Sequence, residues 1–165
     1  QGMIDVFVEF IHQNLGAELA VFIAAILPVI EVRGAIPLGI TMGLGPFDAF
    51  AISFVGAMFP VPFILLAFRK ILRFLSQFSA LRKFVDRLTG RSLRKGKQVQ
   101  KYGLWGLVAF VGTPLPGTGV WTGSIIAVLL GLPLKRALPA LFLGNLVAAL
   151  AVLLMTQGVA ALLQQ

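Results

Sequence analysis

The chain has 165 residues, of which 58% are hydrophobic and only 12% are charged, and its mean hydropathy is +0.95. This composition excludes an ordinary soluble domain and indicates an integral membrane protein built of apolar helices. The net charge of +8 does not indicate a nucleic-acid partner, because eleven of the fourteen Lys and Arg residues lie between Arg69 and Lys101.

The first third of the chain predicts one surface helix and one membrane-crossing unit. Residues 3–14 mix acidic and apolar side chains, which predicts an amphipathic helix on the membrane surface. The following segment, Leu19–Met42, is apolar but is interrupted by proline and glycine, which break or weaken helices. A turn at Gly43–Phe47 then precedes Asp48–Phe68, an apolar segment long enough to cross a bilayer as an intact helix.

Residues 69–101 form a basic linker between two apolar regions. Apolar residues recur at helical spacing in its first half, which predicts an amphipathic helix. Lys- and Arg-rich segments beside membrane helices stay cytoplasmic and attract anionic headgroups. We therefore expect a cytoplasmic linker with lipid-headgroup contacts at Arg69, Lys70 and Arg73.

The second half repeats the order of the first. Tyr102–Leu130 is again apolar and broken, Gly131–Leu134 is a turn, and Lys135–Met155 is a long apolar segment. A constant shift of 88 residues aligns Gly43-Leu44 with Gly131-Leu132, Ala49 with Ala137, Phe54 with Phe142 and Gly56 with Gly144. The pattern predicts two repeats, residues 17–68 and 102–163, within a single membrane domain.

The broken segments predict the architecture. Irregular backbone at membrane depth is tolerated only where protein or a water-filled cavity satisfies it, and paired broken segments are typical of inverted-repeat transporters. We expect an all-α integral membrane protein with two inverted repeats, each a re-entrant helical hairpin followed by a transmembrane helix. This topology places Lys135-Arg136 on the cytoplasmic side with the linker, and both termini on the opposite side. Four ordinary spans would separate these basic groups.

Two charged residues stand out in the first broken segment. Glu31 and Arg33 are the only ionisable residues between Glu18 and Asp48. A charge at mid-bilayer costs at least about 2.5 to 3.5 kcal/mol, so such residues usually face a cavity and are functional. We expect Glu31 to change protonation during transport and Arg33 to bind an anionic group. The alternative is that the two side chains pair only to hold the shape of the hairpin.

Further candidate residues lie in the second half. Thr113 and Thr118 offer hydroxyls, Trp121 could line a substrate path or only pack, and Asn145 could bind substrate or form an interhelical hydrogen bond. Hairpin-shaping roles are expected for Pro28, Gly34, Pro37, Pro114, Pro116, Gly117 and Gly119. One histidine, no cysteine and no phosphate-binding loop leave no enzyme motif, so we expect no catalytic residue, no metal and no cofactor.

Two motifs carry a resemblance to a known family. Residues 28–37 read PVIEVRGAIP, and residues 112–123 read GTPLPGTGVWTG. Together they resemble the small multidrug export protein family, which is similar to the DedA superfamily. The resemblance implies two facing re-entrant hairpins, with Glu31 and Arg33 at the acidic and basic positions of the first. Many DedA proteins carry arginines in the second hairpin, where this chain has threonine, proline and glycine.

Three functions remain open from the sequence. The first is a small secondary transporter of the plasma membrane, proton- or ion-coupled, with a midplane site between the hairpins. The second is a DedA-like translocase or scramblase of polyprenyl-phosphate or phospholipid. The third is a membrane structural or assembly factor that presents the basic linker. The expected partners are membrane lipids, a small-molecule or lipid substrate, and a second copy in a homodimer.

Overall fold

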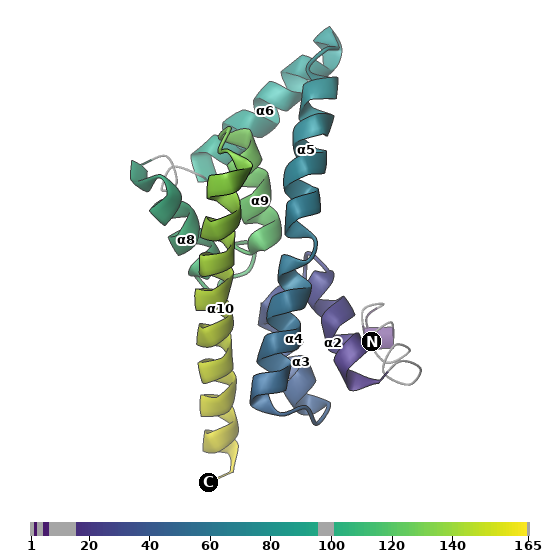
Figure 1. Cartoon of the computed structure of the whole chain (residues 1–165), viewed down its shortest axis with the longest axis vertical. Helices are drawn as coiled ribbons and strands as arrows, with labels where there is room; N and C mark the ends of the chain where they lie inside the picture. The colour runs from purple at the N-terminus through teal and green to yellow at the C-terminus, as the bar shows by residue number, and fades with distance from the viewer. Residues whose placement is uncertain (1, 3–4, 7–15, 96–100, 165) are drawn as a thin grey trace. The chain divides into compact units, whose positions relative to one another are not determined.

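The computed structural model describes residues 2, 5–6, 16–95 and 101–164, and these residues form helices and turns without a strand (Figure 1). The helices are α2 (Ala17–Ile26), α3 (Glu31–Thr41), α4 (Pro46–Met58), α5 (Val61–Leu75), α6 (Ser79–Lys95), α8 (Leu104–Gly112), α9 (Val120–Leu129) and α10 (Leu134–Leu163). The predicted all-helical class is confirmed. The surface helix predicted over residues 3–14 falls outside the described residues, except for residues 5 and 6.

Two segments are long and apolar enough to cross a membrane, Pro46–Leu75 and Leu134–Leu163, with 30 residues each. Thirty helical residues extend about 45 Å, which exceeds the hydrocarbon core of about 30 Å. The first segment continues seven residues beyond the predicted end at Phe68. The basic linker therefore begins as the last two turns of α5, and α6 follows after a short turn.

The first long segment is not the intact helix that the sequence predicted. It is divided between α4 and α5 at Phe59-Pro60. Pro60 and Pro62 have no N–H group, so the carbonyls of Gly56 and Met58 lose their usual helical donors. Backbone angles at Phe59 and Pro60 nevertheless stay in the right-handed helical region, which keeps the interruption short.

The chain divides into two compact units. Unit 1 consists of residues 1–59 and 145–165, and unit 2 consists of residues 60–144. Each unit contains one of the two broken segments and part of each long segment.

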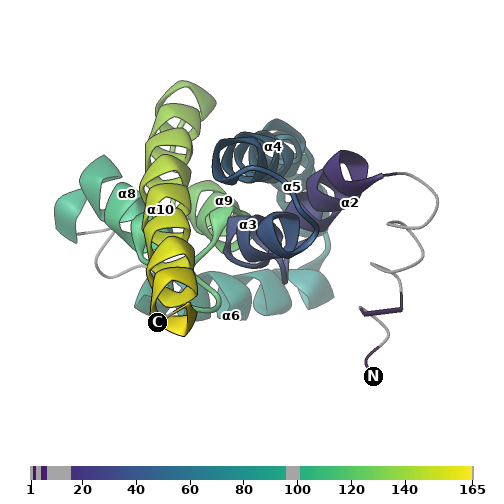
Figure 2. The ribbon, with the colours of Figure 1, turned by 90° about the horizontal axis from the view of Figure 1, so that it is seen from below.

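In unit 1, α4 packs against both α2 and α3, and α2 packs against α3 (Figures 1 and 2). Gly56 permits the close approach of α4 to α2, because an added Cβ would lie 2.8 Å from the Cβ of Ala25 and 2.8 Å from the carbonyl oxygen of Phe22. Gly39 serves the contact between α3 and α4, where an added Cβ would lie 2.9 Å from the Cβ of Ala49. Small residues thus let the helix backbones come together, as is common in membrane helices.

In unit 2, α9 packs against α5, α6 and α8. Gly144 in α10 approaches α8 as Gly56 approaches α2, because an added Cβ would lie 2.8 Å from the Cβ of Val111 and 3.0 Å from the carbonyl oxygen of Val108. A long-range bond also ties α5 to the turn before α10. There the Nη2 atom of Arg69 donates to the carbonyl oxygen of Leu132 over 2.6 Å.

The sequence offset of 88 corresponds to equivalent backbone structure at the ends of α3 and α9. Gly43 and Gly131 both adopt positive φ, 88° and 68°, and each closes a Schellman motif. The amides of Met42, Gly43 and Leu44 donate to Leu38, Ile40 and Gly39, and those of Leu130, Gly131 and Leu132 donate to Ile126, Val128 and Ala127. Every donor and acceptor of the second set lies 88 residues after its counterpart in the first.

Candidate functional site

The first break lies between α2 and α3, at residues 27–30. Leu27 has an extended backbone, with φ −70° and ψ 136°, as expected for a residue that precedes a proline. Pro28 therefore ends α2, and the amides of Ile30 and Glu31 donate to the carbonyl of Leu27 to close the turn. The position of the break agrees with the role predicted for Pro28.

Glu31 begins α3 in an unusual backbone conformation. Its φ is +48°, and it is the one non-glycine residue with positive φ in the described ranges. This conformation costs roughly 1 to 2 kcal/mol for a residue with a Cβ. Such strain persists only where surrounding structure enforces it, and it is concentrated at functional sites.

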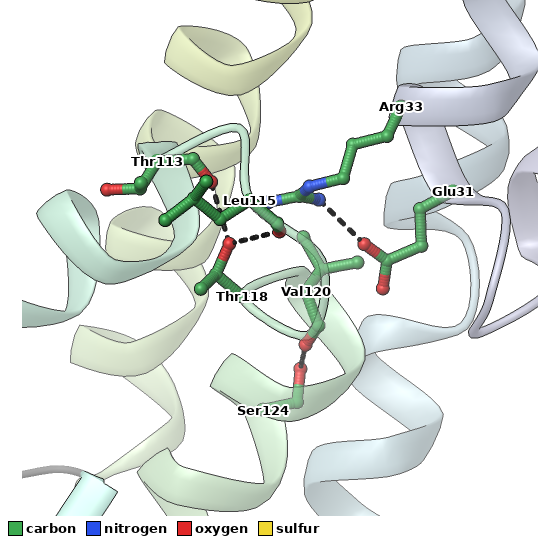
Figure 3. Close-up of polar contacts among 7 residues, drawn as sticks. All are labelled: Glu31, Arg33, Thr113, Leu115, Thr118, Val120 and Ser124. Carbon is green, nitrogen blue, oxygen red and sulfur yellow. Dashed lines mark hydrogen bonds and ion pairs between the residues drawn. The ribbon is translucent and has the colours of Figure 1, made fainter.

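Arg33 pairs with Glu31 at this strained helix start. The Nη1 atom of Arg33 donates to Oε2 of Glu31 over 2.9 Å, and the two side chains are 17% and 5% exposed (Figure 3). In the interior of a protein, such a pair stabilises only if its geometry is good, and removing one partner leaves a buried charge unpaired. Loss of the charge on Glu31 would therefore break this ion pair.

Two more residues predicted to shape the first hairpin lie inside α3. An added Cβ at Gly34 would lie 2.7 Å from Cγ2 of Ile30, so Gly34 allows the tight turn that leads into the helix. Pro37 does not break the helix, because α3 continues to Thr41. Because Pro37 has no N–H group, the carbonyl of Arg33 lacks its usual helical donor. One helical hydrogen bond is therefore absent next to the ion pair, although the helix continues.

The second break lies between α8 and α9, at residues 113–119. Thr113 is extended, with φ −71° and ψ 122°, and it precedes Pro114 as Leu27 precedes Pro28. Pro116 and Gly117 follow, and Gly117 has a φ of +79°. The two breaks thus begin with the same proline-directed conformation.

The threonine hydroxyls of the second break are engaged with the loop itself. The Oγ1 atom of Thr113 donates to the carbonyl of Ala109 over 2.7 Å. The Oγ1 atom of Thr118 lies 2.7 Å from the carbonyl oxygens of both Thr113 and Leu115 (Figure 3). The Thr113 hydroxyl therefore caps the end of α8 and the Thr118 hydroxyl stabilises the loop. These are shaping roles that the sequence did not assign to them.

The start of α9 carries the remaining predicted residues of this break. Gly119 is buried at the N-cap, and Trp121 in the first turn is half-buried. Ser124, which the sequence analysis did not single out, is fully buried and donates to the carbonyl of Val120 (Figure 3).

Unit 1 contains two buried polar side chains without a hydrogen-bond partner among the described residues. Asn145 is 1% exposed, and both its amide nitrogen and its amide oxygen are unpaired; the Oγ atom of Ser53 in α4 is buried and unpaired as well. Burying an unpaired polar group costs about 1 to 3 kcal/mol. The sequence indicated Asn145 as a candidate site residue but did not indicate Ser53. The signal for Ser53 was a single hydroxyl on an apolar helix face that also carries Ala49 and Gly56.

The three predicted headgroup contacts differ in their surroundings. Lys70 and Arg73 are exposed on the last turns of α5. Arg69 is half-buried, and its guanidinium is held by the Leu132 carbonyl. Arg69 therefore fastens α5 to the turn before α10 in addition to any contact with lipid.

Comparison with known proteins identifies the family of this chain. The model of the family described as "Putative small multi-drug export protein" matches residues 31–151. The chain belongs to this family. The matched region begins at Glu31, directly after the first break, includes Arg33 and the second break, and ends within α10. No curated protein and no solved structure matches the chain. The export family and the two apolar segments together support a membrane protein that acts as a transporter.

Proposed function

We propose that the protein is a proton-coupled secondary transporter that exports small molecules, with the Glu31–Arg33 pair as its coupling site. The observation that carries the proposal is the burial of this ion pair at a strained helix start, inside a broken apolar segment. Ionisable groups in such positions usually mark an ion or substrate path. The family description supports export in general.

The pair suggests a simple coupling step. When Glu31 is ionised, its carboxylate accepts the hydrogen bond from Arg33. When a proton binds the Glu31 carboxylate, the charge that holds the guanidinium is neutralised, and Arg33 becomes available to an anionic or polar group of a substrate. Release of that proton on the other side of the membrane restores the pair and returns the transporter to its first state.

Unit 1 also supplies polar groups that could serve the same path. Of the four buried polar or charged side chains in the described residues, Glu31, Ser53 and Asn145 belong to unit 1, and only Ser124 belongs to unit 2. Because the side chains of Ser53 and Asn145 have no partner among the described residues, their polar atoms can bind water or substrate. This supports their assignment to the transport path.

The proposal includes the re-entrant, inverted-repeat architecture. Helices α2, α3, α8 and α9 have 9 to 11 residues, which extend only about half of the roughly 30 Å hydrocarbon core. The helices of each pair pack against each other, which favours a hairpin over one continuous span. Equivalent proline breaks and Schellman ends support the repeat. The positive-inside rule then favours a cytoplasmic basic linker.

We also propose a homodimer and a plasma-membrane location. The chain also stays assigned to transport rather than to catalysis. The DedA-like lipid translocase is the less favoured alternative, because the described polar groups of the second break are hydroxyls and backbone groups, which carry no charge for a phosphate headgroup.

The test is transport by the purified full chain in liposomes that contain a pH-sensitive dye, with the anionic dye sulforhodamine B as the exported probe. We expect sulforhodamine B movement to be linked to proton movement in the same direction in the wild type, because Arg33 is available to a substrate only while Glu31 holds its proton. Glu31→Gln should abolish this linkage, because glutamine cannot release a proton. Glu18→Gln is the matched control, since Glu18 is an exposed acid of α2, and it should behave as the wild type.

Two results would contradict the proposal. One is undiminished proton dependence in Glu31→Gln. The other is the absence of proton-linked sulforhodamine B movement in the wild type, which would favour the lipid-translocase or assembly-factor alternative. Neutralising the basic residues of α6 separates these two, because it should abolish function only for the assembly factor.

A further inference from the structure

Unit 2 has a groove of about 370 Å³ between α8 and the first turns of α10. Its lining residues are Leu104, Trp105 and Val108 of α8 together with Lys135, Arg136, Pro139, Ala140 and Leu143 of α10. From Lys135 to Leu143, the groove follows α10 for about 12 Å. Apart from the two basic residues at one end, every lining side chain is apolar.

The basic end of the groove suits an anion. Lys135 and Arg136 are exposed, and within the described part of the chain no ion pair or hydrogen bond engages either side chain. They lie in the first turn of a 30-residue helix, where the helix dipole also favours negative charge. Two unpaired cations beside an apolar groove match a ligand that has an anionic head and an apolar tail.

The aromatic residues near the groove indicate its position relative to the bilayer surface. Trp105 in the first turn of α8 is 72% exposed, and Tyr102, which precedes the helix, is also exposed. Trp and Tyr are typical of the boundary between headgroups and acyl chains. Trp105 also lines a second, smaller groove of about 270 Å³ with Tyr102, Gly106 and Ala109, so its side chain contributes to two apolar grooves.

We propose that this groove binds an anionic phospholipid of the surrounding bilayer. The phosphate lies at Lys135 and Arg136, and an acyl chain follows the apolar floor past Val108 toward Leu143. Charge complementarity selects this occupant: a cationic amphiphile would be repelled at the basic end, and a zwitterionic lipid would gain less from it. The site is independent of the transport reaction proposed for unit 1.

Tryptophan quenching tests this contact directly. The chain has two tryptophans, so Trp121→Phe leaves Trp105 as the sole fluorophore. The full-length protein is placed in phosphatidylcholine vesicles that contain a small fraction of either brominated phosphatidylglycerol or brominated phosphatidylcholine. Bromine quenches only a tryptophan that it contacts. We expect the anionic brominated lipid to quench Trp105 more strongly than the zwitterionic one at equal content.

A pair of double variants separates the groove from diffuse attraction to the surface. Lys135→Gln/Arg136→Gln removes the two charges of the groove, and Arg82→Gln/Lys83→Gln removes two adjacent exposed charges of α6. The first should reduce the preference of Trp105 for the anionic lipid by about 30-fold, at roughly fivefold for each charge. The second should leave the preference at Trp105 unchanged.

Two outcomes would overturn the proposal: equal quenching by both brominated lipids in the Trp121→Phe protein, or the same loss of preference in both double variants. Circular dichroism verifies that each variant is folded. If the groove double variant is not folded, Arg136→Gln alone should still lower the preference about fivefold.

Discussion

In unit 1, the guanidinium of Arg33 donates to the carboxylate of Glu31 over 2.9 Å, although Glu31 has the positive φ that a side chain usually avoids. Glu31 is the less exposed of the two, with 5% of its side chain exposed against 17% for Arg33. The two partners are therefore not equivalent, because removal of Arg33 leaves the more deeply buried charge without its partner.

This asymmetry predicts the order of stability among single variants. Arg33→Gln should lower the free energy of unfolding by about 3 to 5 kcal/mol, the cost of removing one partner of a buried ion pair. Glu31→Gln should cost less, since the remaining guanidinium is better solvated. Unfolding by sodium dodecyl sulfate in detergent micelles, followed by circular dichroism, measures both. The double variant should be more stable than Arg33→Gln, and additive losses would show that the pair is not coupled.

The glycines at the helix contacts predict that alanine substitutions there lower the free energy of unfolding. Gly56→Ala and Gly144→Ala place a Cβ 2.8 Å from an existing Cβ, that of Ala25 or Val111, and close to a backbone carbonyl. Each should therefore lower the free energy of unfolding by about 1 to 3 kcal/mol. Gly158→Ala in α10 is the control, because nothing lies within 4 Å of its added Cβ. It should be neutral or slightly stabilising, and equal effects at all three positions would contradict tight packing at the first two.

Much of the fold could be predicted from the sequence because proline and glycine act locally. Pro28 and Pro114 fix the residue before them in an extended conformation, and both breaks occur there. The sequence does not predict the interruption at Phe59-Pro60, because an apolar segment of this length favours one continuous helix. Pro37 does not break its helix, because α3 continues past it.

The candidate site was predicted less completely, because its contacts depend on packing between distant segments. The spacing of Glu31 and Arg33 suggested an ion pair, but their unequal burial and the strain at Glu31 depend on the folded unit. The bond from Arg69 to Leu132 joins residues 63 positions apart, and no local pattern indicates it. The sequence does not distinguish Ser53 from other helix residues, and the folded structure shows that it is buried.

The repeat predicts equal costs at two distant turns. Gly43→Ala and Gly131→Ala each force a Cβ into a positive-φ position with nothing else within 4 Å. The cost should therefore be that of the backbone alone, roughly 1 kcal/mol at each site. Gly90→Ala, in open space within α6, should cause no loss. Detergent unfolding measures all three variants, and a much larger loss at only one of the two turns would argue against their equivalence.

The hydrogen bond of Arg69 predicts that Arg69 contributes more to stability than its neighbour Lys70. Arg69→Met removes a charged donor from the carbonyl of Leu132, which should cost about 1.5 to 3 kcal/mol. Lys70→Met removes the same charge from an exposed position and should change the stability by less than about 0.5 kcal/mol. The comparison is made by thermal unfolding in micelles. A similar loss in both variants would assign the effect to charge rather than to the hydrogen bond.

The unpaired amide of Asn145 predicts opposite effects on stability and on transport. Asn145→Leu replaces a buried side chain that has no partner in the described residues with an apolar one. Removal of the desolvation cost should raise the free energy of unfolding by about 1 kcal/mol. If Asn145 binds water or substrate on the path, the same variant should slow sulforhodamine B export in liposomes severalfold. Val147→Leu on the exposed face of α10 controls for the added bulk, and it should change neither quantity. A stabilised Asn145→Leu protein with wild-type export would remove Asn145 from the path and leave the Glu31–Arg33 pair as the site.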